Sequence, residues 1–368
     1  MDLAIDLVID LVKGPEPPPA WGPHREARTS CTTLFGVIEP ALATTTLGDT
    51  GLAVTRMGLG LAALGRPAYI TLGREIDLGS DRHRTTMEQH SHRMLDAAYA
   101  AGIRYLDTAR SYGRAEEFLA SWLAERNVPP GAITVGSKWG YRYTGAWDID
   151  AAVHETKDHS LAMFRAQLPQ TSALLGPYLG LYQVHSATLE SGVLEDAEVL
   201  RAVATLRDSG VAVGLTVSGP RQADVIRQAF EVDVDGSNPF STVQATWNVL
   251  EPSVGPSLAE ARARGWGVLV KEALANGRLT DRGEDRRTNA LEIVATRRGA
   301  TVDGVAMAAA LAQPWADVVL SGAVTVSQLE SNLAAFELSL TDDDFDLLGA
   351  LTEDPVHYWD RRSALPWH

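Results

Sequence analysis

The chain alternates between short apolar runs and longer segments in which apolar residues recur every three or four positions. Short runs of this kind predict buried strands, and the longer segments predict helices that bury one face. We expect strands to start at Met57 and to occupy residues 103–106, 133–137, 179–184, 211–217, 242–245, 267–270 and 318–320. We expect helices at residues 88–101, 114–125, 151–167, 195–209, 222–230, 257–264 and 326–337.

Eight strands separated by helices favour a closed, parallel (β/α)8 TIM barrel of the α/β class. An open doubly wound sheet is the alternative, but no glycine-rich phosphate loop follows the first strand. Residues 47–54, LGDTGLAV, predict a hairpin before the barrel. We therefore assign residues 46–352 to the barrel, residues 1–45 to an N-terminal extension with a proline-rich linker, and residues 353–368 to a C-terminal tail.

Composition narrows the classes of partner. The 368 residues are 45% hydrophobic and carry a formal net charge of −15, which argues against a nucleic acid or an anionic membrane as partner. Cys31 is the only cysteine, so an intrachain disulfide and a cysteine-based metal site are both excluded. No run is long enough to span a membrane, and we expect a cytoplasmic protein. His90 and His92 lie two apart on a predicted helix and point to different sides, so we expect no metal site.

Three successive strands end in ionisable residues, Asp107, Lys138 and His185, and Tyr112 lies in the loop after the first. The loops after the strands build the active site of a parallel barrel, so these side chains should converge. With a pKa of about 10, tyrosine is too weak an acid, and a nearby ammonium would lower that value. Asp107 could orient Lys138, and His185 could donate a hydrogen bond to a carbonyl oxygen. This chemistry suits carbonyl reduction, with the hydride supplied by a cofactor.

The segments DAAYAAGIRYLDTARSYG, VGSKWG and YQVHSA, in this order, closely resemble motifs of the aldo-keto reductase superfamily. The resemblance covers about residues 46–350. It implies a (β/α)8 barrel that binds a nicotinamide dinucleotide at the C-terminal ends of its strands. It also implies that Tyr112 is the proton donor and acceptor, that Lys138 and Asp107 tune it, and that His185 orients the substrate carbonyl.

The resemblance also implies a set of cofactor contacts. Ser218 and Gln244 would hold the nicotinamide carboxamide, although Gly219 stands where the family usually has asparagine. Lys271 stands where many members have an aromatic residue that stacks on the nicotinamide, and it adds a second cation. The full expected set is Gly60, Asp107, Ser218, Gln244, Lys271, then Leu274, Asn276 and Gly277 around the pyrophosphate, and Gly322, Thr325, Gln328 and Asn332 at the adenosine end.

The choice of dinucleotide depends on positive charge near the adenosine ribose. A 2′-phosphate needs arginine or lysine, and residues 318–337 contain neither. The preceding loop offers Arg278, Arg282, Arg286 and Arg287. We expect NADP(H), as in most of the family, with NAD(H) as the alternative.

Aromatic residues cluster after the strand that carries Lys138. Trp139, Tyr141, Tyr143 and Trp147 predict either packing beneath a long loop or an aromatic substrate pocket. Arg110 borders Tyr112 and is a candidate substrate contact. Two further expectations concern neighbouring segments: His154, Lys157, Asp158 and His159 on the solvated face of helix 151–167, and Tyr358, Trp359 and Trp367 closing over the mouth.

Taken together, these features predict an NAD(P)H-dependent oxidoreductase that interconverts an aldehyde or ketone and its alcohol. Its partner would be a small carbonyl or alcohol substrate. Two alternatives stay open: a Schiff-base lyase that uses Lys138 as its nucleophile, and a non-catalytic regulatory subunit that binds a dinucleotide. The sequence specifies neither the substrate nor the oligomeric state.

Overall fold

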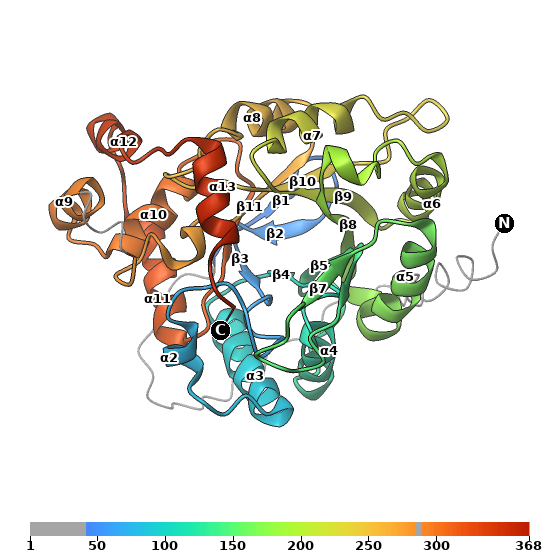
Figure 1. Cartoon of the computed structure of the whole chain (residues 1–368), viewed down its shortest axis with the longest axis horizontal. Helices are drawn as coiled ribbons and strands as arrows, with labels where there is room; N and C mark the ends of the chain where they lie inside the picture. Colours follow the sequence, from blue (N-terminus) through green and yellow to red (C-terminus); the bar gives the residue numbers. More distant parts are fainter. Residues whose placement is uncertain (1–41, 284–288, 368) are drawn as a thin grey trace, which may run out of the picture.

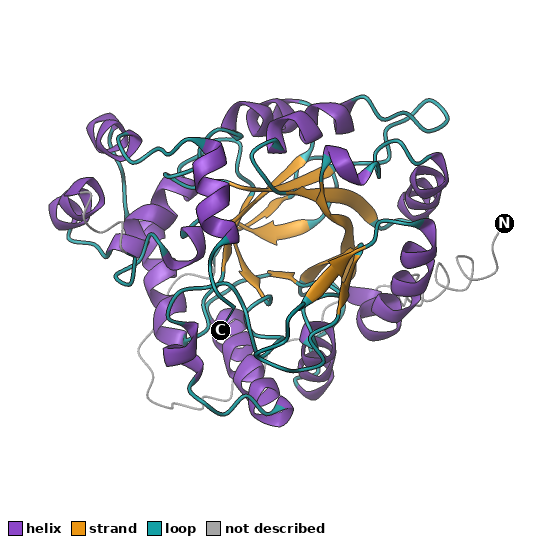
Figure 2. Cartoon of the chain, in the orientation of Figure 1, coloured by secondary structure: helices purple, strands orange, loops and turns teal. Residues whose placement is uncertain are grey.

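Eight parallel strands close into a barrel at the centre of the molecule, as the sequence predicts (Figure 2). The computed structural model describes residues 42–283 and 289–367. Strands that follow one another along the chain are paired, and β12 pairs with β3 to close the barrel. The strands are β3 (Met57–Gly60), β4 (Tyr105–Asp107), β5 (Thr134–Trp139), β8 (Leu179–Ala187), β9 (Ala212–Val217), β10 (Thr242–Thr246), β11 (Gly267–Lys271) and β12 (Val318–Ser321).

Helices surround the barrel, and α13 lies over one side of it, near β11 (Figure 1). Among the described residues, no helix has the length and apolarity needed to cross a bilayer. The helices are α2 (Arg74–Leu78), α3 (Arg84–Ala100), α4 (Ala115–Glu125), α5 (Leu161–Leu175), α6 (Ala197–Asp208), α7 (Gln222–Phe230), α8 (Gly255–Ala263), α9 (Asn289–Arg298), α10 (Val302–Leu311), α11 (Val326–Ala334), α12 (Asp342–Gly349) and α13 (Pro355–Ser363).

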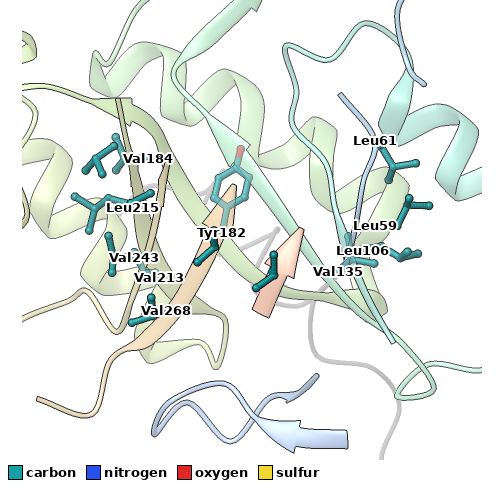
Figure 3. Packing of buried hydrophobic residues seen from close by; sticks show 14 of the residues in the cluster. Leu59, Leu61, Leu106, Val135, Tyr182, Val184, Val213, Leu215, Val243 and Val268 are labelled. Carbon is teal, nitrogen blue, oxygen red and sulfur yellow. The ribbon is translucent and has the colours of Figure 1, made fainter. Parts of the chain in front are cut away.

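Apolar side chains of the strands form the core, and Figure 3 shows part of it, including Leu106, Val135 and Val213. The barrel strands pack closely enough that some positions require glycine. A Cβ at Gly58 would lie 2.8 Å from Cδ1 of Tyr105. Burial of this continuous apolar surface is the main force that holds the barrel closed.

A hairpin before the barrel closes the end where the strands begin. Its strands β1 (Thr44–Thr46) and β2 (Ala53–Thr55) pair antiparallel, so the predicted hairpin is present but its first strand precedes residues 47–54. Leu47 and Val54 are fully buried in one cluster with Tyr105 and Leu181 from the barrel strands. The site must therefore lie at the opposite end, where the strands finish.

The helix expected at residues 151–167 is wrong in its first half. Residues Glu155–Lys157 form strand β7, which pairs antiparallel with β6 (Tyr141–Tyr143). Helix α5 begins only after Ser160, whose Oγ accepts a hydrogen bond from the Met163 backbone N–H at 3.2 Å. This capping bond and the β6–β7 backbone ladder outweigh the local helical pattern. His154 and His159 are consequently buried rather than on a solvated helix face.

Leu47→Ala tests the role of the hairpin. Leu47 has no exposed surface, so truncation should lower the free energy of unfolding by about 2–5 kcal/mol through lost burial and the cavity that remains. Urea unfolding followed by circular dichroism would measure this loss. Thr45→Ala, at an exposed position of the same hairpin, is the matched control and should change stability by less than about 0.5 kcal/mol. Equal losses of stability in the two variants would contradict the role of buried Leu47 in closing this end of the barrel.

Candidate active site

One cavity of about 990 Å³ opens at the ends of the barrel strands. It gathers all of the residues that the sequence assigned to a dinucleotide, together with Tyr112 and His185. Those residues are Gly60, Asp107, Ser218, Gln244, Lys271, Leu274, Asn276, Gly277, Gly322, Thr325, Gln328 and Asn332. The volume falls within the range of small-molecule and cofactor sites.

Asp107 and Lys138 form a buried ion pair beneath the cavity. Lys138 is fully buried, and its Nζ donates to Oδ1 of Asp107 and, at 2.8 Å, to the Thr108 carbonyl. Gln244 Nε2 donates to Oδ2 of Asp107 at 2.8 Å, so the carboxylate is held from two sides. Burial lowers the pKa of Lys138, while the Asp107 carboxylate opposes that shift.

Tyr112 and His185 face each other at the cavity wall. The Tyr112 hydroxyl lies 3.5 Å from Nε2 of His185, and Lys138 Nζ lies 5.0 Å from the centre of the Tyr112 ring. Burial and the Asp107 carboxylate raise the pKa of Tyr112 well above its usual value. The net shift is thus opposite to the lowering expected from Lys138 alone. Burial and the Lys138 charge hold the pKa of His185 well below its usual range, so the ring is neutral.

Sequence reasoning missed several residues that line the same cavity. The guanidinium of Arg66 lies 5.1 Å from the Tyr112 ring and 4.9 Å from the Trp367 ring, and it donates to Glu155 at 2.9 Å. Tyr69 lies beside Arg66, 4.7 Å from its guanidinium. Both come from the long loop after β3, which has no periodicity or motif to mark them.

Glu272 is a second residue that the sequence did not mark. Its backbone has φ of 57°, and its carboxylate accepts hydrogen bonds from Arg362 Nε at 2.9 Å and Thr246 Oγ1 at 3.0 Å. Burial opposes ionisation, but the Arg362 guanidinium and the Lys271 ammonium outweigh it and lower the pKa of Glu272 to about 2. This ion pair fastens α13 to the wall of the cavity.

The C-terminal segment contributes one of its three tail aromatics to the cavity. Trp367 lines the cavity and stacks on His154, with ring centres 4.3 Å apart. Tyr358 and Trp359 are buried residues of α13 instead. The Tyr358 hydroxyl accepts a hydrogen bond from Asn248 at 2.9 Å. The tail therefore reaches the mouth through Trp367.

The four residues expected to contact substrate lie in different environments. Trp139 is 1% exposed and packs on Phe164, with ring centres 5.0 Å apart, which is core packing. Arg110 forms an ion pair with the buried Glu116. Trp147 Nε1 donates to the Arg82 carbonyl at 2.7 Å. Only Tyr141 of this set lies against a ring of the candidate site, with its centre 4.9 Å from that of His185.

Two asparagines give part of the cavity the character of a polar ligand site. Among the described residues, Asn276 Oδ1 and Asn332 Oδ1 are buried without a hydrogen-bond partner, and both residues line the cavity. Buried acceptors are rarely left unpaired, so these atoms suit hydrogen-bond donors of a bound ligand. The residues present therefore fit a bound dinucleotide.

The histidine pair on α3 has other partners. His90 Nε2 lies 2.5 Å from the Val324 carbonyl, and His92 Nε2 lies 2.9 Å from Ser121 Oγ. Within residues 42–283 and 289–367, no group of three potential metal-ligating side chains comes together.

Comparison with known proteins agrees with this geometry. The family model described as "Aldo/keto reductase family" matches residues 56–353. The NADH-specific methylglyoxal reductase of Escherichia coli is 24% identical over 83% of this chain and 97% of its own length. The aryl-alcohol dehydrogenase [NADP(+)] of Phanerodontia chrysosporium is 23% identical over 91% of this chain and 87% of its own.

Solved structures share the fold. The holo form of the aldo-keto reductase AKR11C1 from Bacillus halodurans aligns with a TM-score of 0.64 at 21% identity, covering 86% of this chain and 98% of that one. The match of the family model spans all eight barrel strands and the candidate site between them. The chain therefore belongs to the aldo/keto reductase family of NAD(P)-dependent oxidoreductases.

Proposed function

We propose that this protein interconverts a small aldehyde or ketone and its alcohol, with Tyr112 as general acid and base. The observation that carries the proposal is the juxtaposition of Tyr112 and His185, whose polar atoms are 3.5 Å apart in the cavity that also holds the dinucleotide residues. One carbonyl oxygen can reach both groups at that separation.

In the reducing direction the residues divide the work as follows. A dinucleotide held by Ser218, Gln244 and Lys271 would supply the hydride for the carbonyl carbon. The Tyr112 hydroxyl gives its proton to the carbonyl oxygen, and neutral His185 orients that oxygen by a hydrogen bond. The Lys138 ammonium, held by Asp107, stabilises the phenolate that remains. The raised pKa of Tyr112 makes its phenol a weaker acid than free tyrosine, so the proton transfer depends on the stabilisation of the phenolate by Lys138.

The two alternative functions receive less support. A Schiff-base lyase needs an accessible neutral amine, whereas Lys138 is fully buried and donates to Asp107 and Thr108. A non-catalytic subunit would not require four reactive side chains to converge. The names of the two relatives, a methylglyoxal reductase and an aryl-alcohol dehydrogenase, support the carbonyl and alcohol class.

Dinucleotide preference depends on Asp77. Its carboxylate accepts hydrogen bonds from Arg282 Nη1 and from Gln328 Nε2, at 2.6 and 2.7 Å. A 2′-phosphate would have to compete with Asp77 for Arg282. Arg278 pairs with Glu353. Arg286 and Arg287 lie outside the described residues. We propose that NAD(H) binds at least as tightly as NADP(H), although the sequence favoured the latter.

Tyr112→Phe should reduce turnover at least about 100-fold, because phenylalanine has no hydroxyl proton to give to the carbonyl oxygen. The dissociation constant for the dinucleotide should change less than about threefold, since the ring remains. A spectrophotometric screen of aldehydes and ketones with NADH and NADPH measures the first quantity, and fluorescence titration measures the second. Tyr99→Phe, on the outer helix α3, is the matched control. Undiminished turnover in the Tyr112 variant would exclude this tyrosine as the acid.

Asp77→Asn should tighten NADPH relative to NADH by roughly tenfold, because Arg282 becomes available to the 2′-phosphate. Titration calorimetry with both dinucleotides would give the ratio of their dissociation constants. Glu75→Gln removes the same charge from an exposed position of α2 and should leave the ratio within twofold. Equal ratios in the two variants would show that only overall charge matters.

A further inference from the structure

Lys271 brings an ammonium group to the cavity wall. It ends strand β11, and its Nζ donates to Thr246 Oγ1 at 2.7 Å and to Ser218 Oγ at 3.3 Å. Its side chain is 16% exposed, and its nearest carboxylate, Glu272, is 4.0 Å away. Its Nζ also lies 5.7 Å from the centre of the Trp359 ring of α13, and the catalytic proposal requires no cation here.

The position of Lys271 relative to a nicotinamide ring follows from the proposed function, on which this inference rests. A hydride donor must contact the carbonyl carbon whose oxygen reaches Tyr112 and His185. The adjoining wall of the cavity is formed by Ser218, Gln244 and Lys271. The resemblance assigns Ser218 to the nicotinamide carboxamide, and Lys271 Nζ donates to Ser218 Oγ, so the ammonium would lie beside a bound ring.

We propose that Lys271 is a specificity-determining residue that makes the site bind the reduced dinucleotide more tightly than the oxidised one. The two forms differ at the nicotinamide ring, which is positively charged when oxidised and neutral when reduced. A partly desolvated ammonium beside the ring repels only the charged form. The protein would thus take up NADH and release NAD⁺, which suits carbonyl reduction.

The surrounding charges leave Lys271 as the excess cation. Glu272 is engaged by Arg362 of α13, and on the barrel side Lys138 is paired with Asp107. His185, which also faces this region, is neutral because its pKa lies well below the usual range. Two carboxylates thus face three cations, and Lys271 has the weakest pairing of the three.

Raising the pH removes the positive charge on Lys271. Burial lowers the pKa of Lys271 to about 8, and the Glu272 carboxylate opposes that shift. Arg362 and Lys138 lower the pKa further, and Asp107 raises it, by smaller amounts. Below that value the ammonium is present and NAD⁺ is disfavoured. Above it the repulsion is lost, so NAD⁺ should bind more tightly relative to NADH as pH rises.

The experiment measures dissociation constants of NADH and NAD⁺, with NADPH and NADP⁺ in parallel, by titration calorimetry without carbonyl substrate. In the natural protein, the ratio of the NAD⁺ constant to the NADH constant should fall roughly tenfold from about pH 6.5 to about pH 9.5. Lys271→Met should show the low ratio at both pH values. Lys271→Arg, which stays charged, should keep the high ratio at both.

Lys157→Met is the matched control. This lysine is also at the mouth, where it donates to the Ser186 carbonyl at 3.0 Å and lies 5.5 Å from the Tyr141 ring. Its removal should leave the ratio within twofold at each pH. An unchanged ratio in Lys271→Met, or equal weakening of both forms, would overturn the inference but not the proposed function. Failure of all four dinucleotides to bind would overturn both.

Discussion

The carboxylate of Asp107 is the group on which the candidate site depends. It ends β4, accepts from Lys138 of the neighbouring β5, and accepts from Gln244 of β10. A buried charge is tolerated only with partners of good geometry, so these contacts fix the relative positions of three strands. Tyr112 and His185 line the same cavity as Asp107. The same contacts support the proposal that Lys138 acts through its charge and not as a nucleophile, because its ammonium already donates to Asp107 and Thr108.

The barrel strands and the strand-end residues were predictable because both follow from local pattern. An apolar run bounded by a polar residue predicts a buried strand, and Asp107, Lys138 and His185 each terminate such a run. In a barrel those terminations meet, so one-dimensional spacing becomes a three-dimensional cluster. The family resemblance added the dinucleotide residues, all of which line the cavity.

The loops were less predictable, because their conformations are selected by distant partners. Trp139 and Trp147 looked alike as candidates, yet Trp139 is held by Phe164 in the core and Trp147 by the Arg82 carbonyl. The strand β7 is stabilised by pairing with β6 rather than by its own sequence. The positions of Arg66 and Glu272 at the cavity depend on contacts with residues that are far away in the sequence. Local patterns carry no trace of such contacts.

The hairpin beneath the barrel has a consequence for the traffic of ligands. Because Leu47 and Val54 fill the end where the strands begin, the cavity is a blind well that opens past α13 and Trp367. A dinucleotide that spans the well from Tyr112 to Asn332 would cover its floor, and a carbonyl compound would rest above it. If both molecules use this opening, the larger one would have to arrive first and depart last.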